Sequence, residues 1–227
     1  ENIVIDKYVT LVGVGDTSIL RKASNAPIVT ITGSGDSHAD PLTLKDLRIE
    51  TDKCYGIIFP DGSATEYILF DDISVVGSPV AYTESEAGVW VRSTASVKNW
   101  KVINCYFSES DYAFYFQKDV GGTSGSTIQY FNMNGTQLVS NSHKAMYIEK
   151  LANANFNNCL IKDNGLVDFW NGKWNAGIDI NLKGGNYSQI TFTNCTFSGN
   201  AKCFQEGAGL MLKARDDGAT YGADPAT

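Results

Sequence analysis

Two acidic residues, Glu149 and Asp179, have a spacing that could support hydrolysis of a glycosidic bond. They lie in neighbouring copies of a strand-like phrase, and stacking of these copies would place the two carboxyl groups roughly 6–8 Å apart. Glycoside hydrolysis uses two carboxyl groups about 5–9.5 Å apart, one as the acid and the other as the base or nucleophile. We therefore name both residues as catalytic candidates. Because the chain has 25 acidic residues, a chance pairing of solvated or salt-bridged carboxylates is the alternative interpretation.

Aromatic, amide and charged side chains accompany this acidic pair. Alternation along the phrase predicts which side chains face outward. The outward set contains the substrate-binding candidates Trp90, Arg92, Tyr115, Gln117, Tyr147 and Asn181. Sugar-binding surfaces use this mixture, because rings pack on the apolar faces of sugars while amides and charges bind hydroxyls and carboxylates. The alternatives are a face covered by a loop or a neighbouring subunit, and an ordinary solvated surface.

Loops supply further candidates. The insertion 168–174 holds two of the four tryptophans, Trp170 and Trp174, which would form a clamp over a ligand. Packing of these large apolar groups onto their own coil is the alternative. Acidic residues that precede the phrase in other coils, among them Glu86 and Asp111, are expected to cluster on one side of the molecule.

The sequence supports neither a metal site nor a cofactor. His38 and His143 are isolated, which argues against a histidine metal site and against a Ser/His/Asp triad. Five cysteines with no CxxC pair argue against a closed disulfide framework and against a structural zinc site.

Two recurring phrases must position these side chains. The first is an apolar residue, a spacer, Asp or Asn, and then an apolar residue or Cys; its copies are 44–47, 70–73, 102–105, 130–133, 156–159 and 192–195. The second alternates like a strand, and its copies begin at Ile57, Val89, Phe114, Met146, Ile178 and Leu210, which are 25 to 32 residues apart. Two phrases that share a period, with variable loops between them, indicate the coils of a solenoid.

A coil of this length cannot bury its own apolar face, so coils must stack, with rungs about 4.8 Å apart. The last residues of the first phrase would then form a buried column, Leu47, Ile73, Cys105, Met133, Cys159 and Cys195, in which Cys acts as a small hydrophobe. The polar residues before them would stack at a corner and bond amide to amide, namely Asp46, Asp72, Asn104, Asn132, Asn158 and Asn194.

These patterns predict an all-β fold: a parallel β-helix, or single-stranded solenoid, of about seven to eight coils over residues 1–215, with a C-terminal tail at 216–227. A leucine-rich repeat has a shorter period and a leucine pattern that is absent here. The chain starts in a strand-like segment without an evident cap, so we expect the cap to lie in preceding sequence or on a partner.

Charge and hydropathy limit the partners. With a net charge of −7 and four arginines, the chain is a poor candidate for binding nucleic-acid phosphates. No apolar run approaches the roughly 20 residues that span a membrane. We therefore expect neither a nucleic-acid partner nor a membrane partner.

The phrases with Asn and Cys, together with the opening segment 9–16, resemble the pectin-lyase-like superfamily of right-handed parallel β-helices over residues 3–215. The opening segment resembles the first coil of extracellular polysaccharide-degrading members and of bacteriophage tailspikes. Two departures leave the reaction open. Arg92 has no nearby cluster of three acids, which a pectate-lyase-type site would require, and Asp71-Asp72 lies in the corner phrase rather than in a hydrolase-type aspartate pair.

The resemblance implies a module of extracellular, cell-surface or virion location that recognises a polysaccharide or a cell-surface glycan. Whether it also degrades the glycan, as a hydrolase or a lyase, is left open. The alternative is a purely structural spike or adhesin module, for example a homotrimer, whose outward aromatic strip is an interface with a subunit or partner. Both alternatives share one fold, because function in this superfamily depends on sites added to the fold.

Overall fold

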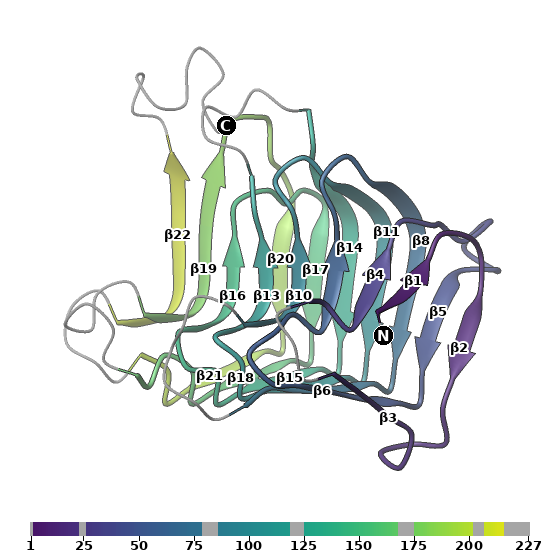
Figure 1. The fold of residues 1–227 in the computed structure, drawn as a ribbon. Helices are drawn as coiled ribbons and strands as arrows, with labels where there is room; N and C mark the ends of the chain where they lie inside the picture. Colours follow the sequence, from purple (N-terminus) through teal and green to yellow (C-terminus); the bar gives the residue numbers. More distant parts are fainter. Residues whose placement is uncertain are drawn as a thin grey trace.

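The structure, a computed structural model, describes residues 2–22, 26–78, 86–118, 125–167, 175–201 and 207–215. Its strands form three parallel sheets that wrap around one core, as Figure 1 shows. Each described strand pairs with strands one coil before or after it. The prediction of an all-β parallel solenoid is confirmed. It makes about six turns, slightly fewer than the seven to eight coils predicted.

Sheet 1 carries the second phrase and has eight strands: β1 (Ile3–Ile5), β4 (Val29–Ile31), β7 (Ile57–Phe59), β10 (Ala87–Val91), β13 (Tyr112–Phe116), β16 (Lys144–Ile148), β19 (Ala176–Lys183) and β22 (Ala208–Arg215). The predicted register is confirmed, since Ile57, Val89, Phe114, Met146, Ile178 and Leu210 are consecutive pairing partners. The first five of these side chains are fully buried.

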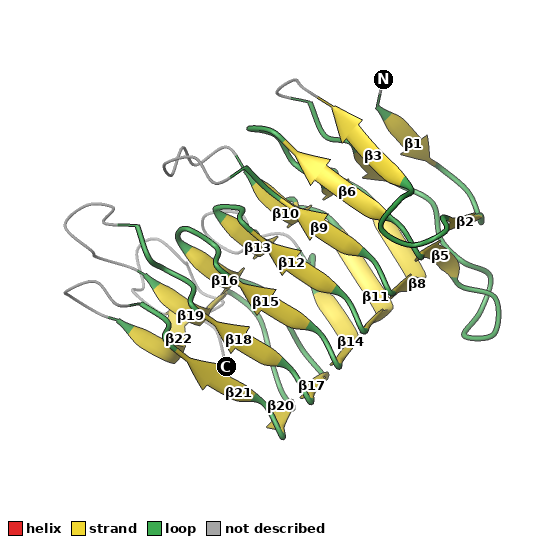
Figure 2. Cartoon of the chain, turned by 90° about the horizontal axis from the view of Figure 1, so that it is seen from below, coloured by secondary structure: helices red, strands yellow, loops and turns green. Residues whose placement is uncertain are grey.

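Sheet 2 carries the apolar start of the first phrase and has seven strands: β2 (Thr10–Val12), β5 (Leu42–Lys45), β8 (Ala64–Asp71), β11 (Ser96–Ile103), β14 (Ile128–Asn134), β17 (Ala154–Asn157) and β20 (Ile190–Thr193). Sheet 3, nearest the viewer in Figure 2, has seven: β3 (Ile19–Lys22), β6 (Arg48–Thr51), β9 (Ser74–Val76), β12 (Tyr106–Ser108), β15 (Gln137–Val139), β18 (Leu160–Lys162) and β21 (Thr196–Ser198).

Aromatic rings fill the middle of the core. Trp100 on β11 is fully buried. Its ring centroid lies 5.1 to 6.0 Å from the rings of Phe59, Phe70, Phe114, Phe116 and Phe131, which come from sheets 1 and 2. Inward side chains of both sheets therefore interlock, which is how a stack of short strands buries enough apolar area to be stable.

The corner between sheets 2 and 3 requires a left-handed backbone. Asp46, Asp72, Asn104, Asn158 and Asn194 all have φ between 51° and 55°. Asp and Asn tolerate this conformation better than other residues with a β-carbon, because their short polar side chains can bond the local backbone. The recurring Asp or Asn therefore reflects backbone geometry, and it marks a corner as the sequence predicted.

Asn132 was wrongly assigned to this corner. It lies within β14, where it pairs with Lys101 and Asn155. Gly135, with φ of 63°, takes the corner position, and Thr136 follows it in the place predicted for Met133. Because glycine also adopts positive φ readily, this coil needs no Asp or Asn at the corner. The residue predicted for the corner, Asn132, lies three positions before the actual one.

An amide ladder exists, but at the opposite corner, between sheets 3 and 1. Asn141 Nδ2 donates to Asn164 Oδ1 at 2.8 Å, and Asn164 Nδ2 donates to Asn200 Oδ1 at 2.9 Å. Asn141 and Asn164 are fully buried, whereas Asn104, Asn158 and Asn194 at the predicted corner are exposed. Burial makes an unpaired amide costly, so the continuous ladder forms where water cannot replace it.

The cysteines in the described part of the chain behave largely as small core residues. Cys54, Cys105 and Cys159 are buried, and Cys195 is partly buried. Burial raises the pKa of both Cys105 and Cys159 to about 12, so neither is a reactive thiolate. No helix in the described part of the chain is long and apolar enough to cross a membrane.

Candidate functional site

The outward face of sheet 1 carries a strip of aromatic side chains in register. Trp90, Tyr115 and Tyr147 lie on β10, β13 and β16 and are consecutive pairing partners. The Trp90 and Tyr115 rings are parallel, with centroids 5.8 Å apart, and the Tyr115 and Tyr147 centroids are 5.4 Å apart. All three side chains are half-buried. Strand alternation therefore predicted these three positions correctly.

Two further tyrosines, which were not among the sequence candidates, extend the strip. The Tyr55 ring lies 4.3 Å from Trp90, and the Tyr112 ring lies 5.1 Å from Tyr115. Both occupy the position two residues before the first apolar residue of the second phrase. That shared position was the signal available in the sequence.

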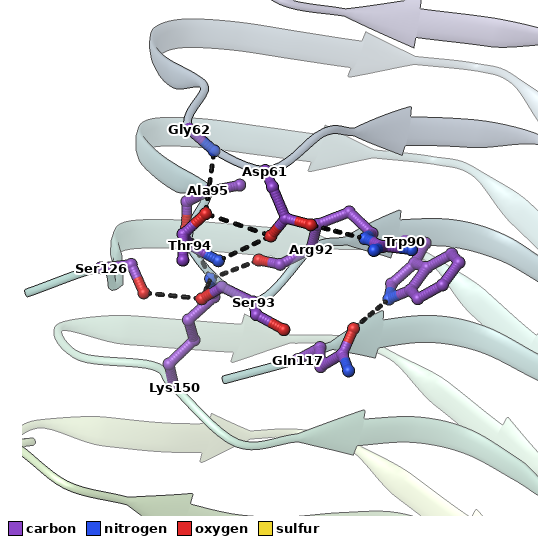
Figure 3. Close-up of polar contacts among 10 residues, drawn as sticks. All are labelled: Asp61, Gly62, Trp90, Arg92, Ser93, Thr94, Ala95, Gln117, Ser126 and Lys150. Atoms are coloured by element: carbon purple, nitrogen blue, oxygen red, sulfur yellow. Dashed lines mark hydrogen bonds and ion pairs between the residues drawn. The ribbon is translucent and has the colours of Figure 1, made fainter. Parts of the chain in front are cut away.

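Polar groups flank the Trp90 end of the strip, as Figure 3 shows. Trp90 Nε1 donates to Gln117 Oε1 at 3.2 Å, and the Arg92 guanidinium lies 4.4 Å above the Trp90 ring. Arg92 Nε donates to Asp61 Oδ2 at 3.0 Å. Aromatic, amide and cationic groups thus converge at one place, which is the mixture that binds polar ligands with apolar faces.

A turn after β10 holds Arg92. Ala95 N donates to Arg92 O at 3.1 Å, and Asp61 accepts from Thr94 N at 3.0 Å and from Thr94 Oγ1 at 3.1 Å. Burial by itself would raise the pKa of Asp61, but the hydrogen bonds from Thr94 and Arg92 hold it below its usual range. Asp61 is therefore an ionised anchor for both the turn and the guanidinium.

Glu149 and Asp179 are buried and bound to lysines. The two residues are 2% and 1% exposed. Lys183 Nζ forms an ion pair with Glu149 Oε1, and Lys144 Nζ donates to Asp179 Oδ2 at 2.8 Å. Burial lowers the pKa of Lys144, and Asp179 opposes this change. Each carboxylate is therefore neutralised by an ammonium group, an arrangement typical of structural ion pairs. The catalytic role of the pair stays a prediction.

Asn181 joins the aromatic strip to these ion pairs. Asn181 Nδ2 donates to Tyr147 Oη at 2.8 Å, and burial raises the pKa of Tyr147. Among the described residues, Asn181 Oδ1 and Asp179 Oδ1 are buried acceptors without a hydrogen-bond donor. The structure thus brings Asn181 to the strip, as the sequence predicted, but in a buried position.

A second acidic site lies at the corner that leads into sheet 1. Glu86 and Asp111 directly precede β10 and β13, and both are buried. Burial raises the pKa of Glu86 to about 7, with further contributions from Asp111 and Asp52; hydrogen bonds from Thr51 and Ser78 oppose this rise. The expected proximity of these two loop acids is observed. The raised pKa of Glu86 results mainly from burial, and the sequence did not reveal that burial.

The remaining candidates are placed as follows. Trp170 and Trp174, like the proposed tail 216–227, lie outside the described residues. His143 Nδ1 lies 2.8 Å from Tyr112 Oη, and the His38 ring packs edge-on against Tyr67. Both histidines thus contact an aromatic residue.

A family model described as "Right handed beta helix region" matches residues 28–220 of the chain. No curated protein and no solved structure matches the chain. The family match covers most of the three sheets, including all the strands that form the aromatic strip.

Proposed function

The chain belongs to the right-handed β-helix family, and we propose that it is a module that recognises polysaccharide through the outward face of sheet 1. The observation that carries this proposal is the in-register strip of Trp90, Tyr115 and Tyr147 with Arg92 and Gln117 beside it. A glycan lying across the coils would meet one ring on each successive rung.

The residue types suit this role. Trp, Tyr and Arg contribute disproportionately to binding energy, because each combines a large contact area with a polar group. Arg92 lies over the Trp90 ring, and Gln117 holds the indole N–H, so the three groups are ordered before a ligand arrives. Such preorganisation lowers the entropy cost of binding.

The charges around the strip favour a neutral ligand. Arg92 is paired with Asp61, Lys144 with Asp179, and Lys183 with Glu149. A carboxylated sugar would have to compete with a protein carboxylate for each of these cations, in a chain whose net charge is −7. We therefore propose a neutral, hydroxyl-rich polysaccharide. Its affinity should change little between low and physiological ionic strength, because exposed ion pairs are the interactions that salt screens.

A glycan array followed by binding measurements in solution tests the proposal. Trp90→Ala should weaken binding of the selected glycan by about tenfold or more. Tyr106→Ala is the matched control, since Tyr106 is an exposed aromatic residue on sheet 3, 37% exposed. Equal losses in the two variants, or no binding by the unmodified chain across a broad panel, would overturn the assignment of this face.

Degradation is a separate question with its own experiment. Polysaccharide cleavage by the unmodified chain, abolished by Glu149→Gln or Asp179→Asn while binding is retained, would support the predicted acidic pair. Because both carboxylates carry ion pairs, the stability of each variant must be measured alongside. Cleavage that persists in both variants would exclude the pair as the catalytic acid and base.

The same strip supports a second candidate function, a structural spike or adhesin module of extracellular or virion location. Half-buried aromatic side chains in a continuous row are also typical of subunit interfaces. Light scattering distinguishes the two. A trimer that dissociates in Trp90→Ala, without glycan binding, would support the structural module.

A further inference from the structure

Lys150 has an unusual environment for a lysine. It follows β16 and is 0% exposed, among the largest fully buried side chains of the chain. Burying an ammonium group costs several kcal/mol unless hydrogen bonds or a counter-charge compensate for the lost water. The hydrogen bonds of the Lys150 ammonium must therefore compensate for the loss of water, and the groups that accept them indicate the structural role of this residue.

The Lys150 ammonium donates to three carbonyl oxygens of a single turn. Its Nζ lies 2.7 Å from Arg92 O, 3.0 Å from Ser93 O and 2.5 Å from Ala95 O. An ammonium group has three N–H donors, so one ammonium can serve all three carbonyls. Figure 3 shows the Lys150 side chain reaching this turn. The turn lies 55 to 58 residues earlier in the sequence, two coils away along sheet 1.

Groups on both neighbouring coils also hold the turn. Asp61 binds Thr94 through both its backbone N–H and its hydroxyl, and Gly62 N donates to Thr94 Oγ1 at 2.9 Å. Ser126 Oγ donates to Ser93 O at 2.8 Å. Three carbonyl dipoles that converge on one point repel each other unless a cation lies between them. Removing the ammonium should therefore disturb the turn even while Asp61 stays in place.

We infer that Lys150 is a positioning residue. By holding the carbonyls of the turn 92–95, it sets the location of the Arg92 guanidinium above the Trp90 ring. Its contribution to ligand binding rests on the proposed function of sheet 1, whereas its effect on Arg92 does not. Lys150 itself is buried and acts only through the turn.

Nitrogen-15 NMR of the whole chain tests this inference without any ligand. The chain has four arginines, so their side-chain Nε–H signals are few, and Arg92→Lys assigns the relevant one. In Lys150→Met the Arg92 Nε–H signal should shift, and its exchange with water should become about tenfold faster as the hydrogen bond to Asp61 loosens. The Arg48 signal, whose Nε donates to Glu50 at 2.8 Å on sheet 3, should stay unchanged.

Controls separate positioning from general damage. Asn164→Ala removes a buried side-chain amide from the ladder between sheets 3 and 1, away from the turn 92–95, and should leave the Arg92 signal in place. If Lys150→Met does not fold, Lys150→Gln keeps two N–H donors and should move the Arg92 signal in the same direction by less. A folded Lys150 variant with an unchanged Arg92 signal and exchange rate overturns the inference.

Binding of the glycan selected on the array provides the second readout. As a single substitution, Lys150→Met should weaken glycan binding by about tenfold. Added to Arg92→Ala, it should cause no further loss of binding, because its effect passes through Arg92. Equal losses in both backgrounds would contradict positioning through Arg92. If no glycan binds the unmodified chain, the proposed function fails, and the NMR result still decides the role of Lys150.

Discussion

Replacing Glu86 with glutamine should make the protein more stable at neutral and alkaline pH. Thr51 Oγ1 and Ser78 N both donate to Glu86 Oε1. Glutamine keeps a carbonyl acceptor for these two donors, and its amide takes the place of the second oxygen. It has the size of a protonated glutamic acid but cannot ionise. The substitution therefore isolates the cost of ionising a buried carboxyl group.

The magnitude follows from the pKa of Glu86, which is about 7 in the folded chain against an ordinary value of 4.5. The folded chain therefore retains a proton that the unfolded chain loses, and its stability falls as the pH rises from about 4.5 to 7. At about 1.4 kcal/mol per pH unit, the loss from this group is about 3 kcal/mol, complete above pH 7. Glu86→Gln should remove that loss.

Urea unfolding followed by circular dichroism at pH 4.5, 6 and 8 is the assay. Glu86→Gln and the unmodified chain should have similar urea midpoints at pH 4.5. At pH 8 the variant midpoint should be higher by about 1 M for a difference of about 3 kcal/mol. Glu109→Gln, an exposed site on the neighbouring coil, is the control and should show no such divergence. A midpoint difference that is the same at pH 4.5 and pH 8, or a lower midpoint for Glu86→Gln at pH 8, would refute this reasoning.

Three further predictions concern stability and are checked by the same unfolding assay. Asn164→Ala should cost about 2–4 kcal/mol, because it leaves several buried partners unpaired, whereas the exposed Asn155→Ala should cost about 1 kcal/mol or less. Asp179→Asn should cost about 3–5 kcal/mol by leaving Lys144 buried and unbalanced; a double-mutant cycle with Lys144→Met that shows no coupling would contradict this pairing. Asn104→Gly should change the stability by less than about 1 kcal/mol, and Asn104→Val should destabilise more, because φ is 53° at this corner. Equal effects of Gly and Val would count against the backbone explanation.

The register of the strip could be predicted, but its accessibility could not. Alternation and period placed Trp90, Tyr115 and Tyr147 in one row, because a stacked coil repeats the same position every rung. The same reasoning placed Asp179 in that row as an outward residue, yet it is 1% exposed. Periodicity reports the direction of a side chain from its own strand, and burial depends on everything else that packs against it.

Residue identity and backbone conformation also differ as signals. The recurring Asp or Asn marks five of the left-handed corners, but in one coil the same pattern points to Asn132 while Gly135 takes the corner. The structure shows that the repeated property is a positive φ, which Asp, Asn and Gly share. A backbone conformation that recurs in every coil is therefore only partly predictable from residue types, because more than one residue type can adopt it.

The sequence by itself determined the solenoid, its coil period and the rows of its sheets, because these depend on apolar residues that recur within one coil and its neighbours. Only the tertiary structure decided the long-range contacts. Lys150 binds a turn two coils away, and Lys183 forms an ion pair with Glu149 of the adjacent coil. These contacts, and the pKa of Glu86, depend on distances and burial that arise only when the coils stack.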